Sequence, residues 1–520
     1  MIRQQAIPNL SFQQWLIQIK ENRLLLWLST TIIILSFTCL KILYPYPNFI
    51  PPDSHSYIEA ASQNKTINVW PTGYSKFLRL ASCFTNSHFI LVLLQYLLLQ
   101  SSLLYLLFTV QYWLSLHKRA FLVILVCSLI NPLLPHISNF VSSDCLFTAL
   151  SLLWLTQLIW IIFRPGMLLL ISHAFVLLLA LMIRHNALYY PVISLLAIWL
   201  TQVPPALKRT GATAIVLLLS TYIGYTQFQY EKLSGKVQYS PFGGWQLAAN
   251  ALNGYAYAEP APKRIPFKFR PLHTITNRHI DSLRRLKKRP DASIGIYYLW
   301  NDQSPLQQYL RENKHKQDSG TSPFKQWAAL GPLYGAYGRF LIAKHPAPFL
   351  RHFIWPNLKS YYSPPTGFMG YYNLGRRTVP PVVVSWFGWK NNQLPSYFND
   401  KKIQTAEVFP LLLPILHLAF FIGFLILLFA AGFRTSLRYA HGLLWWIFLI
   451  WGVNMCFSVC SAPIELRYQL FSMIMTLIFC IVLIERIVST TGLTVKRNST
   501  PILTNAISEP VTLTPINIKP

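Results

Sequence analysis

Long apolar runs, each of about 18 to 22 residues with almost no charge, recur through most of this chain. Each run is long enough to cross a hydrocarbon core of roughly 30 Å as a helix. We predict spans at about 24–43, 88–116, 120–134, 144–163, 166–183, 187–202, 211–230, 409–431, 441–460 and 467–487. The chain is therefore expected to be an all-α polytopic membrane protein with about ten transmembrane helices.

Between the seventh and eighth predicted spans lies a polar segment, 231–406, that is rich in Pro, Tyr and Trp. We expect it to form a large, mixed and loop-rich segment outside the cytoplasm. The predicted parts are a cytoplasmic interfacial helix in 1–23, a seven-span module in 24–230 with a first outer loop at 44–87, the outer loop 231–406, three C-terminal spans in 407–487 and a cytoplasmic tail at 488–520. No small-residue cleavage site follows the first apolar run, so we interpret that run as an uncleaved span.

The positions of Lys and Arg predict the orientation, because short cytoplasmic loops hold the excess of these residues. With the N-terminus inside, the cytoplasmic basic residues are Arg3, Lys20, Arg23, Lys118, Arg119, Arg164, Lys208, Arg209, Arg434, Arg438, Arg486, Lys496 and Arg497. Both termini are then cytoplasmic. The outer loop 231–406 is also basic, with 25 Lys and Arg against 8 Asp and Glu, but long loops translocate largely regardless of charge.

Charge and cysteine content exclude some classes of protein. The formal net charge of +29 lies in loops between spans, so we expect contact with membrane lipid and no nucleic-acid partner. The seven cysteines fall mostly in or beside apolar runs, and the longest polar loop has none, so the sequence predicts neither a disulfide framework nor a CxxC-type metal site.

Ionisable residues gather at four span junctions on the predicted outer side. These residues are Asp53, His55, Glu59, Asp144, Arg184, His185, Glu465 and Arg467. Such groups are expensive at a hydrocarbon boundary unless they are paired or face a watery cavity. We therefore predict a cavity on this face.

The carboxylate of Asp53 has more than one interpretation. It could cap a short helix that runs from Ser54 to Gln63, or act as a general base on an acceptor hydroxyl or amine. Together with His55 and Glu59 it could also bind a divalent metal ion through oxygen and nitrogen ligands, and the sequence leaves metal dependence open.

The other junctions also have two interpretations each. Arg184 and His185 could hold a phosphate oxygen, or they could end a span by snorkelling. The planar guanidinium of Arg467 suits a phosphate, but a simple ion pair with Glu465 explains it equally well. Asp144 suits the N-terminal turn of a helix, where a negative charge is favourable, or it could take part in catalysis.

Two further sequence features concern the outer segments. The turn Trp70-Pro71-Thr72-Gly73-Tyr74 precedes a short amphipathic helix, and could be a surface turn or an element that positions an acceptor or a lipid. The aromatic residues of 231–406 could stack on sugar rings or form a belt at the membrane interface. They include Trp245, Tyr255, Tyr257, Tyr297, Tyr298, Trp300, Tyr361, Tyr362, Tyr371, Tyr372, Trp386 and Trp389. The basic run 284–289 could meet anionic headgroups or an anionic acceptor, or be a solvated face.

The chain resembles the glycosyltransferase C superfamily, the polytopic lipid-linked-sugar transferases related to protein O-mannosyltransferases and to the lipid A aminoarabinose transferase. The residues that carry the resemblance are Asp53-Ser54-His55-Ser56-Tyr57 with Ala60 and Ala61, Trp70-Pro71-Thr72-Gly73-Tyr74 with Phe77 and Leu78, Ser142-Ser143-Asp144, Arg184-His185-Asn186 and Glu465-Leu466-Arg467-Tyr468. The resemblance covers roughly 24–230 and the last spans.

The resemblance implies a first outer loop with two membrane-surface helices and an acidic residue that engages the acceptor. It makes 24–230 a catalytic module, Asp53 the catalytic residue, and Arg184, His185 and Arg467 the residues that bind the donor phosphate. Secondary or acceptor-side residues would be His55, Tyr57, Glu59, Tyr74, Asp144 and Glu465. The chain lacks a second acid beside Asp53 and a soluble C-terminal domain, so acceptor recognition would fall to 231–406.

The resemblance thus implies an inverting membrane glycosyltransferase that moves a sugar from a polyprenyl-phosphate donor to a glycan, lipid or protein acceptor. The active site would be periplasmic, in the inner membrane of a bacterial cell envelope. Two other classes remain open: a transporter or flippase of lipid-linked glycan, and a glycan polymerase or ligase. Against the transporter, the sequence has no paired discontinuous spans in matching halves.

Overall fold

The structure, a computed structural model, describes residues 10–200, 204–259, 265–286, 296–314, 322–398, 401–431 and 440–490. Within these ranges the chain is helical, with isolated β-bridges and no strand. The predicted all-α class is therefore confirmed. Arg3, Lys287, Lys288, Arg289, Arg434, Arg438, Lys496, Arg497 and the tail beyond 490 lie outside the described residues.

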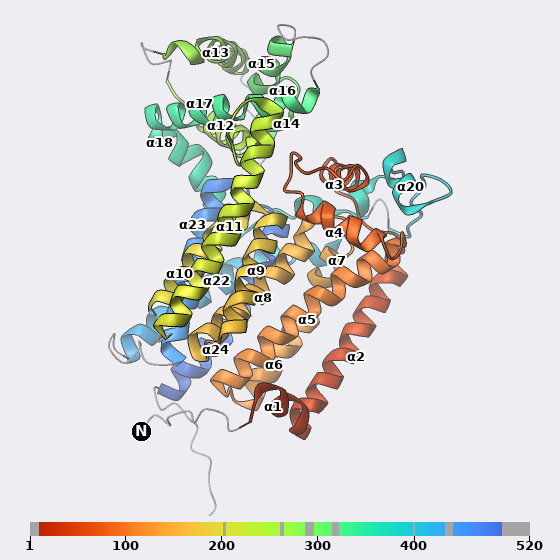
Figure 1. Cartoon of the computed structure of the whole chain (residues 1–520), viewed down its shortest axis with the longest axis vertical. Coiled ribbons are helices and arrows are strands. Elements are labelled where there is room, and N and C mark those ends of the chain that lie inside the picture. The colour runs from red at the N-terminus through yellow and green to blue at the C-terminus, as the bar shows by residue number, and fades with distance from the viewer. Residues whose placement is uncertain are drawn as a thin grey trace, which may run out of the picture.

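A bundle of long helices and the short helices that connect them forms the lower part of the molecule in Figure 1. Its members are α1 (Phe12–Gln18), α2 (Lys20–Leu43), α5 (His88–Leu114), α6 (Lys118–Leu129), α7 (Leu133–Ser138), α8 (Ser143–Phe163), α9 (Met167–Ile183), η1 (His185–Tyr189), α10 (Tyr190–Leu200), α11 (Pro205–Ser234), α22 (Phe409–Ala431), α23 (Ala440–Ser461), η6 (Leu466–Tyr468) and α24 (Leu470–Thr490).

Seven of the helical segments in the described ranges are long and apolar enough to cross a membrane, so the chain is a helical membrane protein. They are Lys20–Leu43, His88–Leu114, Lys118–Ser138, Ser143–Phe163, Gln404–Phe429, Gly442–Ser461 and Leu470–Ser489. The predicted spans at 166–183 and 187–202 correspond to the shorter apolar helices Met167–Ile183 and His185–Leu200. The predicted span at 211–230 lies within α11, which runs beside α9. The total of about ten spans stays a prediction.

The third span differs from its prediction because it is broken. Helix α6 ends before Asn131-Pro132, and α7 resumes at Leu133 with the Asn131 Oδ1 atom accepting a hydrogen bond from the Leu133 amide at 3.0 Å. A proline has no N–H to continue the helical ladder. The segment 135–143, which lies between the predicted spans 120–134 and 144–163, is therefore partly helical.

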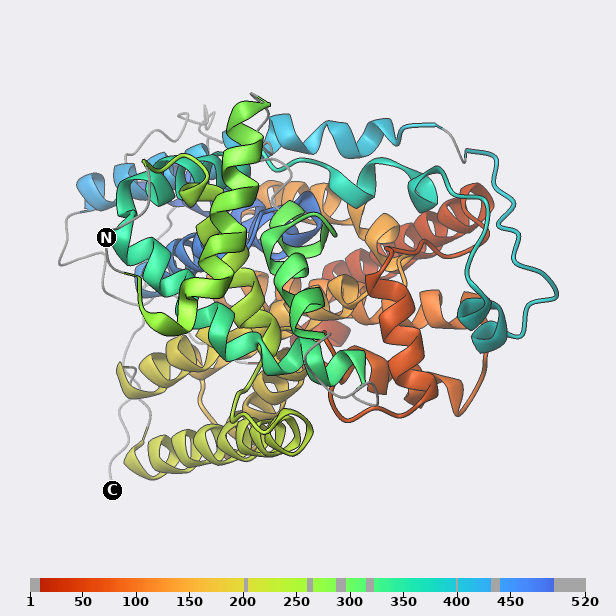
Figure 2. The same cartoon turned by 90° about the horizontal axis from the view of Figure 1, so that it is seen from above.

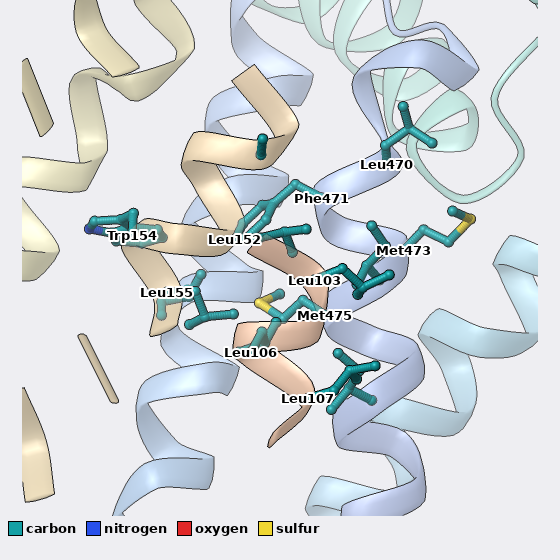
Figure 3. Packing of buried hydrophobic residues seen from close by; sticks show 14 of the residues in the cluster. Leu103, Leu106, Leu107, Leu152, Trp154, Leu155, Leu470, Phe471, Met473 and Met475 are labelled. Carbon is teal, nitrogen blue, oxygen red and sulfur yellow. The ribbon is translucent and has the colours of Figure 1, made fainter. Parts of the chain in front are cut away.

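Side chains from α5, α8 and α24 interdigitate in the middle of the bundle, as Figure 3 shows. Leu103, Leu152 and Trp154 are fully buried there, and Met475 is buried beside them. Burial of apolar side chains inside the bundle leaves exposed leucines and isoleucines on its outside, such as Ile34 and Leu168. That exposed apolar surface is what a lipid-facing helix presents.

The described part of the predicted interfacial helix, 10–23, contains α1 and the start of α2. Helix α1 begins with a capping box formed by Ser11 and Gln14 and ends at Gln18, and α2 then starts at Lys20. Lys118 pairs with Glu21, and the Arg486 Nη2 atom donates to the Leu114 carbonyl at 2.7 Å. These contacts place the starts of α2 and α6 and the ends of α5 and α24 at one end of the bundle. Which side of a membrane this end faces stays a prediction.

The segment 231–406 is not loop-rich, because its described residues are mostly helical. Its elements are α12 (Pro241–Tyr255), η2 (Phe267–Phe269), α13 (Arg270–Arg285), α14 (Tyr297–Trp300), α15 (Pro305–Lys314), α16 (Pro323–Ala329), α17 (Gly331–Lys344), α18 (Pro346–Phe349), η3 (Leu350–Ile354), α19 (Trp355–Tyr362), η4 (Gly367–Gly370), η5 (Tyr372–Gly375), α20 (Pro381–Phe387) and α21 (Gln404–Glu407). Helices α12 to α17 stand above the bundle in Figure 1 and share a second hydrophobic core.

Many aromatic residues of this segment belong to the protein's own cores. Trp245 and Tyr298 are buried in the second core, and Tyr361 and Tyr372 are buried where the segment returns to the bundle. These four are therefore neither sugar-stacking platforms nor members of an interfacial belt. The sequence shows the aromatic residues but not the partners that cover them.

The last part of the segment, 363–403, lies across the same end of the bundle as the first loop, 44–87 (Figures 1 and 2). The first loop forms two short helices, α3 (Asp53–Ser62) and α4 (Gly73–Ser82), as the family resemblance implies. We call this end of the bundle the loop face. Tyr57, Leu78 and Val383 share a small core that joins α3, α4 and α20.

Candidate functional site

The start of α3 is held from both sides by backbone and amide hydrogen bonds. The Asn48 amide donates to the Asn139 carbonyl at 2.7 Å, and the Val141 amide donates to the Asn48 carbonyl at 2.9 Å. On the other side, the Phe49 amide donates to Asn373 Oδ1 and the Asn373 amide donates to Asn48 Oδ1, both at 2.8 Å. The extended strip before α3 is thus fixed between the α7–α8 connection and the segment 363–403.

Asp53 does not cap α3, so that interpretation of its carboxylate is wrong. It is the first residue of the helix, the N-cap position is Pro52, and no side chain caps this end. Ser54 instead accepts a hydrogen bond from the Ile50 amide at 2.7 Å. The Asp53 carboxylate lies 3.3 Å from Nη1 of Arg467.

Five charged side chains from four distant segments meet on the loop face. We call them the charge cluster: Asp53, Asp144, Arg184, Glu465 and Arg467. Arg467 Nη1 lies 3.3 Å from Asp53 Oδ2 and 3.4 Å from Asp144 Oδ2, and its Nε donates to Glu465 Oε2 at 2.9 Å. Arg184 Nη1 pairs with the other oxygen of Asp144. The sequence placed these residues on one face, and the structure brings them into contact.

Burial differs among the five side chains. Asp144 is 1% exposed and Arg467 is 6% exposed, whereas Arg184, Asp53 and Glu465 are 17%, 18% and 19% exposed. Buried ions are tolerated when they are paired and hydrogen-bonded. Asp144 therefore acts as the interior anchor of the cluster, and the other two carboxylates lie nearer its opening.

The cluster holds one more carboxylate than guanidinium, and Asp53 and Glu465 each have a single ion-pair partner, Arg467. Asp144 is met by both arginines and also accepts from Ser142 Oγ at 2.9 Å, whereas Asp53 has a single contact with Arg467. Burial raises the pKa of Asp53 above its ordinary value, the negative charge of Asp144 adds to the increase, and Arg467 only partly offsets it. A carboxylate with a raised pKa is a better proton acceptor than an ordinary one.

Aromatic rings enclose the two guanidinium groups. The ring of Tyr468 lies 4.6 Å from Arg467 and 4.7 Å from Arg184, measured from each guanidinium carbon to the ring centroid. Arg467 Nη2 also donates to the Tyr468 hydroxyl at 2.6 Å. All three nitrogens of Arg467 are thus engaged, while among the described residues only Nη1 of Arg184 makes a hydrogen bond.

The segment 363–403 supplies a cover that the sequence did not predict. Phe368 stacks over Arg467 at 4.9 Å, and the Leu466 amide donates to the Pro365 carbonyl at 2.9 Å. Gly367 has a φ of +51°, and a Cβ atom there would lie 2.9 Å from the Glu465 carboxyl carbon, so only glycine fits. The one local signal for this element is the turn sequence Pro364-Pro365-Thr366-Gly367.

Tyr57 and Tyr74 support the site. The Tyr57 hydroxyl lies 3.1 Å from Ser143 Oγ, next to Asp144, and the two tyrosine rings meet edge to face. The Tyr74 hydroxyl donates to Gln95 Oε1 at 2.7 Å inside the bundle. At the preceding residue, a Cβ on Gly73 would lie 2.5 Å from the Met182 carbonyl oxygen, so the predicted turn is a close contact with the end of α9.

Three predicted site residues lie outside the contacts of the charge cluster. Glu59 is half-exposed and pairs with Lys65 at 2.7 Å. The His185 ring lies 5.0 Å from the Tyr239 ring, tilted by 55°, and has no contact with the cluster. Burial and the positive charge of Arg376 lower the pKa of His55. No group of three metal-binding side chains occurs among the described residues, so the proposed ligands Asp53, His55 and Glu59 do not form a metal site there.

The predicted ion pair of Glu465 with Arg467 is confirmed. The placement of Asp144 in the first turn of a helix is also confirmed, since it is the second residue of α8.

Comparison of the chain with protein-family models, with curated proteins and with solved structures found no match.

Proposed function

We propose that this membrane protein is a glycosyltransferase that moves a sugar from a polyprenyl-phosphate donor to an acceptor at the loop face, with Asp53 as the general base. The observation that carries the proposal is the position of Asp53: it lies at the opening of a buried charge cluster, has one ion-pair partner, and has a raised pKa. Perturbed carboxylates of this kind are typical of catalytic sites.

In the proposed reaction, a hydroxyl or amine of the acceptor attacks the anomeric carbon of the donor sugar. Asp53 takes the proton of that group as the new bond forms. The bond from the anomeric carbon to the phosphate oxygen breaks, and the polyprenyl phosphate leaves with the electron pair. The configuration at the anomeric carbon is inverted because attack and departure occur on opposite faces.

Arg184 is the better placed of the two arginines to meet the leaving phosphate. It is more exposed than Arg467, and its guanidinium has hydrogen-bonding capacity beyond the contact with Asp144. Arg467 is engaged by three carboxylates and a tyrosine hydroxyl, so we assign it first to holding the cluster together. Its contribution to phosphate binding, and those of His185 and the secondary residues, stay predictions.

The test is sugar transfer by the full chain reconstituted in lipid vesicles. Undecaprenyl phosphate carrying labelled glucose, mannose or an amino sugar is supplied as donor, with an extract of membrane glycolipids as acceptor. We expect transfer with at least one carrier, and a loss of about a hundredfold or more in Asp53→Asn.

Asp281→Asn is the matched control. Asp281 also has one arginine partner, Arg284 at 3.2 Å, but it is half-exposed on α13, so its substitution should leave transfer unchanged. A thermal unfolding midpoint of Asp53→Asn that is no lower than that of Asp281→Asn excludes misfolding. The proposal fails if no carrier supports transfer, or if Asp53→Asn remains fully active.

The same vesicles separate the two other classes predicted from sequence. A transporter or flippase would move the labelled carrier across the bilayer without forming a new glycosidic bond. A polymerase or ligase would join two lipid-linked glycans and would not use a carrier with a single sugar as donor. Either result would replace the proposed reaction.

A further inference from the structure

The ring of Tyr468 contacts both guanidinium groups of the charge cluster. Its centroid lies 4.6 Å from the guanidinium carbon of Arg467 and 4.7 Å from that of Arg184. Arg467 and Arg184 are like charges, and they act on each other electrostatically. The face of an aromatic ring attracts cations, so the Tyr468 ring offsets the repulsion between the two arginines.

The position of this ring is fixed by the fold. Tyr468 is the last residue of η6, and its amide donates to the Glu465 carbonyl at 3.0 Å. The Leu466 amide, in the same turn, donates to the Pro365 carbonyl at 2.9 Å. At the far end of the side chain, the Tyr468 hydroxyl accepts a hydrogen bond from Arg467 Nη2 at 2.6 Å. The ring is thus held at both ends.

Arg184 depends on aromatic contacts more than Arg467 does. Arg467 is bound by three carboxylates and by the Tyr468 hydroxyl. Arg184 has one carboxylate partner, Asp144, and its guanidinium carbon also lies 5.8 Å from the ring centroid of Phe147. Removal of the Tyr468 ring should therefore displace Arg184 more than Arg467.

A ring restrains an arginine without using its hydrogen-bond donors in the way a carboxylate does. A carboxylate accepts hydrogen bonds from the N–H groups of a guanidinium, whereas a ring attracts the cation through its quadrupole. Among the described residues only Nη1 of Arg184 makes a hydrogen bond. The Nε and Nη2 groups of Arg184 therefore keep their hydrogens for an anion, and the restraint lowers the entropy lost on binding.

We infer that Tyr468 is a positioning residue: its ring holds Arg184 beside Arg467 and leaves the free N–H groups of Arg184 for a phosphate. The inference rests on the proposed function, in which this phosphate belongs to the polyprenyl-phosphate donor. Tyr468 acts on the phosphate through Arg184.

The first test measures phosphate binding without sugar transfer. Citronellyl phosphate, a short isoprenyl phosphate, is titrated by calorimetry into the full chain in phosphatidylcholine nanodiscs, and the heat from empty nanodiscs is subtracted. Saturable binding is expected, and Tyr468→Leu, which removes the ring, should weaken it about tenfold. Tyr468→Phe keeps the ring and loses only the contact of the hydroxyl with Arg467, so its affinity should stay within about threefold of the wild type.

The second test separates positioning from a purely structural role. In the vesicle assay of sugar transfer, Tyr468→Leu should raise the KM for the donor by about tenfold and change kcat less, because Arg467 keeps its own contact with Asp53. A variant that merely lost folded protein would show a lower kcat and an unchanged KM. Tyr468→Phe should restore the KM.

Phe147→Leu gives a second variant whose result does not depend on the folding of Tyr468→Leu. Because the Phe147 ring lies farther from Arg184, its removal should weaken binding by about threefold. Phe267→Leu is the matched control: the guanidinium carbon of Arg270 lies 5.6 Å from the Phe267 ring, but this ring is 82% exposed and belongs to the segment above the bundle. Its removal should leave phosphate binding and transfer unchanged.

The inference is overturned if citronellyl phosphate does not bind saturably, if Tyr468→Phe and Tyr468→Leu bind it equally well, or if Phe267→Leu weakens binding as much as Phe147→Leu. Ring-dependent binding without sugar transfer from any carrier would support the positioning role and contradict the proposed reaction. Transfer with the same donor KM in Tyr468→Phe and Tyr468→Leu would support the reaction and overturn the positioning role. Inorganic phosphate serves as a competitor, and displacement at equal concentration would show that a free phosphate is held by the same ring-dependent site.

Discussion

The loop face carries two sites rich in charge, and they handle charge in opposite ways. In the charge cluster, three carboxylates and two guanidinium groups are withdrawn from water and compensate one another. In a pocket between Tyr46 and Lys401, the described lining is open and includes the cationic residues Arg377 and Lys401. Buried ions must be paired within the protein, whereas exposed ions are solvated by water and screened by salt.

This contrast assigns different roles to the two sites. The members of the cluster compensate one another's charge inside the fold, so most substitutions there should change stability. Substitutions in the pocket should leave the free energy of unfolding nearly unchanged. Three predictions test this difference.

The largest effect is expected from Arg467→Gln. The substitution leaves Asp53, Asp144 and Glu465 without their shared cation, and removing one partner from a buried ion pair costs about 3–5 kcal/mol. The measurement is the free energy of unfolding by SDS titration in mixed micelles. Arg467→Lys keeps the charge but not the three directions of hydrogen bonding. Its free energy of unfolding should therefore lie between those of the wild type and Arg467→Gln.

A loss below about 1 kcal/mol in Arg467→Gln would mean that the cluster is hydrated like a surface ion pair. The distinction between the two sites would then disappear.

A smaller effect is expected from pH, and it concerns Asp53. Because burial raises the pKa of Asp53 in the folded protein above its ordinary value of 3.8, the folded state binds this proton more tightly than the unfolded state. The resulting stabilisation is present below pH 3.8 and is lost as the pH rises through the folded-state pKa. The free energy of unfolding of the wild type, relative to Asp53→Asn, should therefore increase as the pH falls from 7 to 4.

The Asp53→Asn reference removes the contribution of the other titrating groups from the comparison. An opposite slope would show that the ion pair with Arg467 outweighs burial. Asp53 would then be an ordinary paired carboxylate and a poorer base.

The smallest effect is expected from Lys401→Gln on stability. Lys401 is exposed at the pocket, so the change in the free energy of unfolding should stay within about 0.5 kcal/mol. The same SDS titration measures it beside Arg467→Gln. A loss of several kcal/mol would show that the pocket, like the cluster, is part of the structural framework.

The sequence predicted the site residues better than their partners. The order of the predicted spans placed Asp53, Asp144, Arg184, Glu465 and Arg467 on one face, and these five are in contact. It also placed Glu59 and His185 with them, which pair elsewhere. Position along a span predicts the depth of a side chain but not its direction around the helix bundle.

The cover over the cluster could not be predicted. Phe368 and Gly367 belong to a segment that the sequence shows as polar and rich in turns, and nothing local connects it with Glu465 or Arg467. The same holds for the pocket, where Tyr46 meets residues more than 300 positions later in the chain.

The sequence alone determined the class of the protein, because apolar runs long enough to span a membrane depend only on neighbouring residues. It also determined the short helices α3 and α4 and the gathering of charge at the span ends. Only the tertiary structure decided which charges meet, as with Asp53 and Arg467, which are 414 positions apart. Charge compensation depends on distances of a few ångströms between remote segments, and local sequence patterns carry no such distances.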